Sequence, residues 1–166
     1  MAPSSDTHAP PVPEGFEPLR LKPSGFLQGI GPFWGRRDGD QLAIGLRVEP
    51  RHCNSAGLAH GGFLLSLVDV VLTVGTNFNA DLRRFLPTVH VDCDFVRGAP
   101  AGTWLQGRAD IVRVTGGHAF TQLVLTDEAG QVVARASGIL LLRGEPDPAF
   151  GRDTVLAPPT SLKGSP

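Results

Sequence analysis

The sequence has little of what metal centres, disulfide frameworks and nucleic-acid-binding proteins require. Cys53 and Cys93 are its two cysteines, and they form no CxxC pattern, which argues against a zinc site and a disulfide framework. The 15 basic and 16 acidic residues give a net charge of -1, so no overall positive field favours nucleic acid or an anionic membrane. An anionic ligand would have to be bound by local arginines.

A signal-peptide pattern is also missing, because the N-terminus is polar and proline-rich. There is no long apolar run of the kind that spans a membrane. We therefore expect a chain that works in the cytoplasm and has no membrane partner. At 166 residues, of which 41% are hydrophobic, the chain is long enough for one domain with a single core.

Prolines cluster at both ends of the chain and indicate how it is organised. Residues 1–26 predict an extended or disordered N-terminal arm, and residues 145–166 predict a similar proline-rich tail. The folded domain is predicted to cover residues 27–144 between them.

Hydrophobic periodicity predicts an α+β fold. Residues 33–48 alternate around the turn signal DGD and predict a hairpin. Residues 63–74 form an apolar run too long for a typical strand and predict a helix buried on most sides, although its valines favour strands. Strand-like segments follow at 88–96, 103–114, 119–126 and 131–142. We expect one long helix wrapped by an antiparallel sheet, with a second subunit covering the open face.

Asp69 is the only charged residue between Phe63 and Val74. Burying a carboxylate without a partner is costly, so a sequence avoids it unless something satisfies or uses the charge. Two interpretations stay open. Asp69 accepts hydrogen bonds from a neighbouring strand or in a dimer interface, or it is a catalytic group of the kind enriched in active sites.

His60, Gly61 and Gly62 stand where the predicted helix begins. Glycines let the backbone approach a ligand, and the first amides of a helix are unpaired donors that can hold an oxyanion, but glycines also simply fit a tight turn. Asn54, upstream in the loop, can polarise a carbonyl or cap a turn. His52 and His60 lack a third ligand at metal-binding spacing, so no metal site is expected.

Together these residues carry a resemblance to a known family. The segment 52–62, HCNSAGLAHGG, followed by LVD at 67–69, is similar to the HxNxxGxxHGGxxxxLxD signature of PaaI-like hotdog thioesterases, in the 4-hydroxybenzoyl-CoA thioesterase superfamily. The likeness continues through the strand at 88–95, the turn at 99–102 and a DxxGxxxA hairpin at 127–134. It covers the chain from residue 42 to residue 142.

This resemblance implies a hotdog fold, with a sheet of five to six strands, in a homodimer or homotetramer whose active sites lie at the subunit interface. It also implies an acyl-CoA substrate and no cofactor. Asp69 of one subunit would attack the thioester carbonyl or activate water. From the other subunit, the amide of Gly61 and the side chain of Asn54 would polarise that carbonyl, and His60 would position the loop.

Further substrate contacts are expected from Gly62, Thr73, Thr88, His90 and Arg97. The family often has Ser or Thr on the first strand after the helix, where this sequence offers Thr88 and His90. Thr73 lies on the same helical face as Asp69, although a helix threonine can instead bond back to the preceding turn. Arg97 is a candidate contact for the phosphates of coenzyme A.

The leading hypothesis is therefore a thioester hydrolase that acts on acyl-CoA. The alternative is a non-catalytic acyl-CoA-binding hotdog protein, which would be expected to lack the carboxylate of Asp69. No helix-turn-helix pattern precedes the domain, which argues against a DNA-binding regulator, and the loop expected of a hydratase is not found. The length and the aromatic or aliphatic character of the acyl group do not follow from the sequence.

Overall fold

One antiparallel sheet curves around a long helix, as the hydrophobic periodicity predicts. The structure, a computed structural model, describes residues 11–156. In chain order the elements are β1 (Glu17–Pro18), α1 (Gly25–Ile30), β2 (Trp34–Asp38), β3 (Gln41–Arg47), η1 (Pro50–His52), α2 (Gly61–Asn79), β4 (Thr88–Phe95), β5 (Trp104–Arg108), β6 (Asp110–Val114), β7 (His118–Asp127), β8 (Val132–Leu141), η2 (Pro148–Phe150) and α3 (Arg152–Val155).

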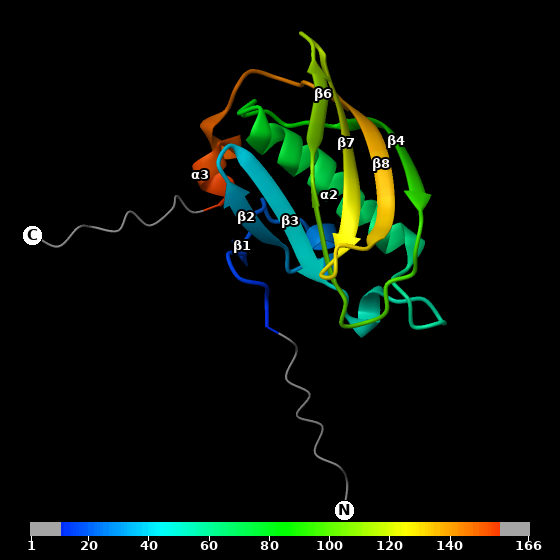
Figure 1. The fold of residues 1–166 in the computed structure, drawn as a ribbon. Helices are drawn as coiled ribbons and strands as arrows, with labels where there is room; N and C mark the ends of the chain where they lie inside the picture. Colours follow the sequence, from blue (N-terminus) through cyan, green and yellow to red (C-terminus); the bar gives the residue numbers. More distant parts are fainter. Residues whose placement is uncertain (1–10, 157–166) are drawn as a thin grey trace, which may run out of the picture.

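The sheet has the strand order β1-β2-β3-β5-β7-β8-β4, and β6 pairs with β7 beside that path. All pairings are antiparallel, and Figure 1 shows the strands curving around α2. The predicted hairpin is confirmed as β2 and β3. The prediction of one strand across 103–114 is wrong, because the chain divides at the buried Ala109 into β5 and β6. The sheet has eight strands rather than five or six.

The helix α2 forms despite its valines, because burial outweighs their preference for strands. Leu67, Val68 and Val71 are fully buried in the main core, where α2 packs against β3, β5, β7 and β8. The length and hydropathy of α2 would suit a membrane span, but 61% of its most apolar stretch is buried inside the fold. It is the core helix of this domain.

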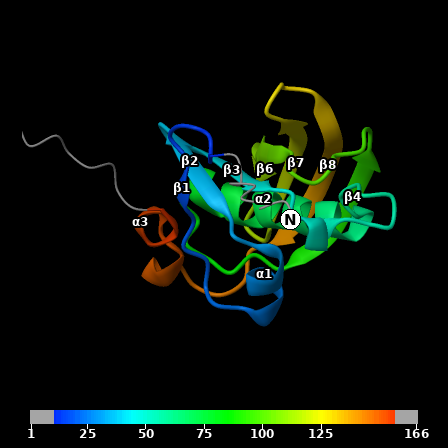
Figure 2. The same cartoon turned by 90° about the horizontal axis from the view of Figure 1, so that it is seen from below.

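One stripe of α2 is not covered by the sheet. Leu65 is exposed, and Ser66, Asp69 and Thr73 are half-buried. Leu65 and Ser66 lie four and three residues before Asp69, and Thr73 lies four residues after it, so these side chains share one helical face. Figure 2 shows that α1 lies on the side of α2 opposite β7 and β8, so the terminal parts of the chain, rather than the sheet, border this stripe.

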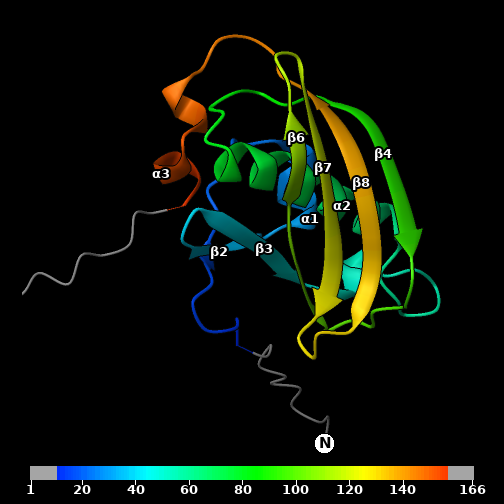
Figure 3. The same cartoon turned by 45° about the horizontal axis from the view of Figure 1, so that its top comes forward.

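Both terminal segments fold onto the domain as far as the structure describes them, which corrects the predicted boundaries at 27 and 144. The ring of Phe16 packs edge-on against Trp104, with centroids 5.1 Å apart. Leu156 is 4% exposed within the main core. The N–H of Arg20 donates to the carbonyl of Val155 at 2.8 Å, so the segments bond to each other, and Figure 3 shows α3 beside the end of α2. Those parts of the predicted arm and tail at 1–10 and 157–166 lie outside the described residues.

Candidate active site

A pocket of about 320 Å³ opens beside the carboxylate of Asp69. The exposed stripe of α2 forms one wall, and the chain from Arg84 to Thr88, which leads into β4, forms another. Residues from 20 to 27 and from 149 to 155 complete the wall on the far side. Most of its lining side chains are apolar, and Asp69 is the only acidic residue among them.

Asp69 combines a fixed oxygen with a free one. The hydroxyl of Thr88 donates to Oδ1 of Asp69 at 2.6 Å, within the short range expected for a hydroxyl bound to a carboxylate. Within residues 11–156 no hydrogen bond or ion pair engages Oδ2. The bond from Thr88 is the hydrogen bond from a neighbouring strand that the structural interpretation of Asp69 expects. It leaves Oδ2 available to a ligand in the pocket.

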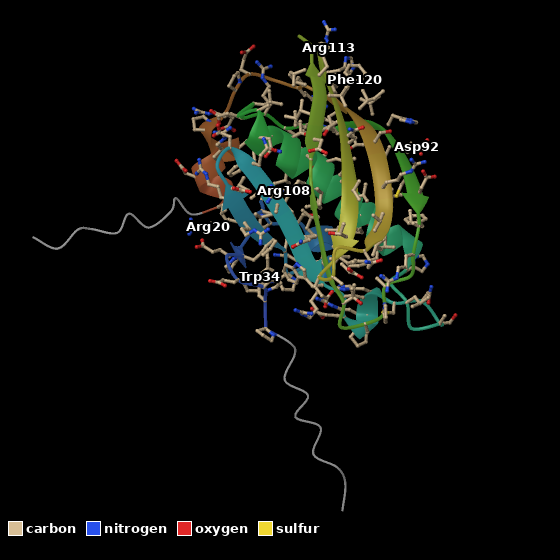
Figure 4. All side chains as sticks on the ribbon, viewed as in Figure 1. Arg20, Trp34, Asp92, Arg108, Arg113 and Phe120 are labelled. Atoms are coloured by element: carbon tan, nitrogen blue, oxygen red, sulfur yellow. The ribbon has the colours of Figure 1, made fainter. Side chains whose placement is uncertain are left out.

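Thr88 and His90 lie on opposite faces of the sheet, although alternation would place residues two apart on the same face. A β-bulge between them shifts the register, so that Thr88 pairs with Leu140 while His90 pairs with Ile139. Thr88 therefore faces α2. His90 shares the outer face with Asp92, which Figure 4 labels on β4. The structure does not bring His90 to Asp69, which corrects its prediction as a substrate contact at this pocket.

Thr73 lines the pocket, but its hydroxyl does not contact the carboxylate. It donates to the backbone carbonyl of Asp69, four residues earlier, at 2.7 Å. This is the bond back to the preceding turn that a helix threonine can make instead of contacting the carboxylate or a water molecule. The hydroxyl oxygen of Thr73 keeps acceptor capacity toward the pocket, whereas its hydrogen is already used.

The loop before α2 is organised around two histidines. Nδ1 of His60 accepts the N–H of Gly62 at 2.9 Å and caps the helix. Nδ1 of His52 accepts the N–H of Glu49 at 3.0 Å, and its ring stacks on Phe63 with centroids 4.1 Å apart. Burial lowers the pKa of His52 below its usual value, and the positive charge of Arg51 adds to that shift. His52 is therefore a neutral structural group that fixes this loop against α2.

Asn54 shapes the same loop through its side-chain carbonyl. Its Oδ1 accepts the N–H groups of Ala56 at 2.9 Å and of Leu58 at 3.3 Å, which is the turn-capping role expected of a loop asparagine. The side chain is exposed. The NH₂ group of Asn54 donates to no other group in the described part of the chain.

The two glycines at the start of α2 have different roles. The N–H of Gly62 is used by the His60 cap, so it is not a free donor for a substrate, and a contact of Gly62 with the substrate stays a prediction. Gly61, the first residue of α2, has no intrahelical acceptor for its N–H, and the described residues provide no other. Eight residues separate Gly61 from Asp69, which is about 12 Å along a helix. One chain alone therefore does not direct both groups at one carbonyl.

Arg97 lies at the far end of β4 from Thr88. Its guanidinium is paired with the buried Asp127, with Nη1 2.9 Å from Oδ2, and Asp127 in turn caps the β7–β8 turn by accepting the N–H groups of Ala129 and Gln131. The side chain of Arg97 is 54% exposed, and its role as a contact for the phosphates of coenzyme A stays a prediction. Arg97 lies close to the loop before α2, where Ala59 bonds to the carbonyl of Ala99.

Sequence reasoning missed the pocket residues of the terminal segments. Leu21 and Leu27 were assigned to the arm or its boundary, and Phe150 and Val155 to the tail, yet all four line the pocket. The apolar character of these four residues indicated burial, but the surrounding prolines favoured an extended arm and tail. Arg20, Lys22 and Arg84 also line the pocket, and within residues 11–156 none of them forms an ion pair.

The class of protein follows from the family that the sequence matches. Residues 56–134 match the thioesterase superfamily. A Pseudomonas aeruginosa protein named "Putative esterase PA0474" is 37% identical over 132 residues, which make up 79% of this chain and 97% of that protein. The chain belongs to the thioesterase superfamily, and this membership supports a hydrolase activity of the thioesterase type.

Solved structures confirm the hotdog fold. The PaaI protein of the phenylacetic acid degradation operon of Escherichia coli superposes with a TM-score of 0.60 at 20% identity, covering 66% of this chain and 77% of that one. A hypothetical thioesterase of Streptococcus pneumoniae, solved with coenzyme A, has a TM-score of 0.61 at 17% identity, covering 69% and 88%. The TT0310 protein of Thermus thermophilus has a TM-score of 0.62 at 23% identity, covering 74% and 100%.

Proposed function

We propose that the protein hydrolyses acyl-CoA thioesters to a carboxylic acid and coenzyme A, with Asp69 as the catalytic carboxylate. The observation that carries this proposal is the state of Asp69. Thr88 fixes one of its oxygens at 2.6 Å, and the other oxygen is open to a largely apolar pocket. A carboxylate held in one orientation beside space for an acyl group suits attack on a thioester.

The reaction breaks the bond between the carbonyl carbon and sulfur. Either the carboxylate of Asp69 removes a proton from water, which attacks the carbonyl carbon, or the carboxylate attacks and the resulting anhydride is then hydrolysed by water. In both routes the carbonyl oxygen becomes negative and coenzyme A leaves as the thiol once protonated. Both routes therefore need a hydrogen-bond donor at that oxygen.

The donors with suitable chemistry are the N–H of Gly61, at the positive end of the α2 dipole, and the NH₂ of Asn54, which have no acceptor among residues 11–156. Since Gly61 lies about 12 Å along the helix from Asp69 of the same chain, we infer that a second copy supplies these donors. His60 holds Gly61 in place through the cap on Gly62.

The edge of the sheet suits such a second copy. β4 ends the strand order, so one side of its backbone has no strand partner among residues 11–156. Val89, Phe95 and Val96 are more than half exposed on or just after this strand, and Leu65 on the neighbouring helix is 41% exposed. Unpaired edges and clustered apolar side chains are characteristic of association surfaces. We propose a homodimer formed here, alone or within a homotetramer.

The comparisons support the choice of substrate. The related Streptococcus pneumoniae structure contains coenzyme A, and the Pseudomonas aeruginosa relative carries the name of an esterase. The pocket offers no second acidic residue of the kind that a glycosidase would use.

The proposal is tested by steady-state hydrolysis of acyl-CoA substrates, detected through the released thiol. Asp69→Asn keeps an oxygen that accepts the Thr88 hydrogen bond but removes the charge, so the rate should fall at least about 100-fold. Asp110→Asn, at an exposed position of β6, is the matched control and should retain wild-type turnover. A wild-type protein that binds acyl-CoA without hydrolysing it would refute the proposal.

A further inference from the structure

The pocket beside Asp69 extends well beyond the reacting groups. Asp69, Thr73 and Asn77 line it in succession along α2, and the eight helical steps from the first to the last span about 12 Å. Nδ2 of Asn77 donates to the carbonyl of Arg84 at 3.0 Å, while Thr88 bonds to Asp69. The segment 84–88 therefore runs antiparallel to the helix along the whole pocket, which is elongated and has Asp69 at one end and Asn77 at the other.

Phe150 closes the end at Asn77. Its carbonyl lies 3.5 Å from Nδ2 of Asn77, and its ring centroid lies 6.4 Å from that of Phe85 across the pocket. Nζ of Lys22 sits 3.7 Å from the same centroid, a cation–π contact that fixes the ring from the other side. The ring is thus held where a chain extending from Asp69 would meet it.

The terminal segments that carry this wall are braced against the core. Nε of Arg152 donates to the carbonyl of Phe78 at 2.7 Å, and Nη2 donates to that of Asn79 at 2.9 Å, so the guanidinium binds the last carbonyls of α2. The backbone bond between Arg20 and Val155 joins the two segments. Both segments lie outside residues 56–134, the part of the chain that matches the superfamily.

We propose that Phe150 is a specificity-determining residue that sets the length of the acyl chain, and that the preferred substrate carries a medium-length aliphatic chain. This inference rests on the proposed function. A volume of about 320 Å³ lies at the small end of ligand pockets, so the pocket takes an acyl group and leaves the nucleotide of coenzyme A outside. Val70, Val74 and Val155 along the walls give the chain apolar contacts.

The test measures kcat/KM for butanoyl-, octanoyl-, dodecanoyl- and hexadecanoyl-CoA with the full-length wild type, Phe150→Ala and Val74→Phe. Phe150→Ala opens the end of the pocket, so the ratio of dodecanoyl to octanoyl turnover should rise about tenfold, because each newly buried methylene favours binding. Val74→Phe fills the middle of the pocket, so octanoyl turnover should fall relative to butanoyl. Phe120→Ala, on the outer face of β7 (Figure 4), should keep the wild-type profile.

The possible outcomes distinguish the role of Phe150 from the proposed thioesterase activity on which it rests. If the wild type hydrolyses none of the four substrates, the proposed thioesterase activity fails. If it hydrolyses them and both pocket variants keep the wild-type chain-length profile, the activity stands and the role of Phe150 is refuted. Phe150→Leu, a smaller change at the same position, takes the place of Phe150→Ala if that variant does not fold, and an unchanged chain-length profile in Phe150→Leu refutes the role of Phe150.

Discussion

The hydroxyl of Thr88 donates to Oδ1 of Asp69 at 2.6 Å and ties the start of β4 to the middle of α2. Nineteen residues separate the two in sequence, and the β-bulge directly after Thr88 turns the next polar side chain, His90, to the other face of the sheet. The bulge thus determines which of two candidate residues reaches the carboxylate.

Removing the Thr88 hydroxyl should impair catalysis rather than folding. A hydrogen bond to a charged group contributes about 1.5–3 kcal/mol, so Thr88→Val should lower kcat about 10-fold to 100-fold. Thr88→Ser keeps the hydroxyl and should restore most of the rate. The measurement is the steady-state kcat of the wild type and both variants with one acyl-CoA substrate. Equal kcat values for the valine and serine variants would show that the bond does not position Asp69.

The N–H of Gly61 can be removed with little change to the helix. Proline is favoured at the first position of a helix, and His60 before it already has the extended backbone (ψ 139°) that a following proline requires. Gly61→Pro should therefore fold but lose about 100-fold to 1,000-fold in kcat, as expected for one oxyanion donor. Gly61→Ala keeps the N–H and serves as its control. Full activity of the proline variant would exclude this amide as the donor.

The lowered pKa of His52 predicts how stability depends on pH. The unfolded chain binds a proton at His52 more readily than the folded one, so the contribution is fully present above about pH 6.5 and is lost as pH falls through the lower folded pKa. The thermal midpoint should drop between pH 7.5 and pH 5. His52→Asn, which keeps an acceptor for Glu49, should be less stable at neutral pH but lose less on acidification. An identical pH slope in both proteins would contradict this assignment.

The terminal segment after β8 should contribute to global stability. Leu156 is 4% exposed in the main core, and truncating a buried leucine to alanine costs about 2–5 kcal/mol. Leu156→Ala should lower the free energy of unfolding by that amount in a urea titration. Val112→Ala, at a site 65% exposed on β6, gives the comparison for an apolar side chain outside the core. A negligible effect at Leu156 would mean that this segment does not pack as described.

Much of the fold was predictable because hydrophobic periodicity reports burial directly. The run from Phe63 to Val74 predicted α2 despite its valines, since its length exceeds that of an ordinary strand. The bulge at Thr88 and the break at Ala109 were not predictable, because each depends on how neighbouring strands pair. The terminal segments were misassigned because prolines suggested an arm, whereas Phe16 and Leu156 carried the opposite signal and are buried.

The candidate site was predictable in its residue types but not in its geometry. The motif from His52 to Gly62 identified the loop, and the structure shows that the N–H of Gly62 serves the His60 cap, whereas the N–H of Gly61 has no acceptor within residues 11–156. Arg97 is paired with Asp127 across thirty positions of sequence, a contact that local patterns do not reveal. Catalytic roles within the loop stay predictions until they are tested by substitution.

The most direct test of the shared site is to mix two inactive variants, Asp69→Asn and Gly61→Pro, under conditions that allow subunit exchange. In a symmetric dimer with sites built from both copies, random exchange makes half of the dimers mixed, and each mixed dimer has one intact site. Hydrolysis of acyl-CoA should therefore recover to about a quarter of the wild-type rate. If the mixture stays as inactive as its components although exchange has occurred, Asp69 and Gly61 do not act across a subunit interface.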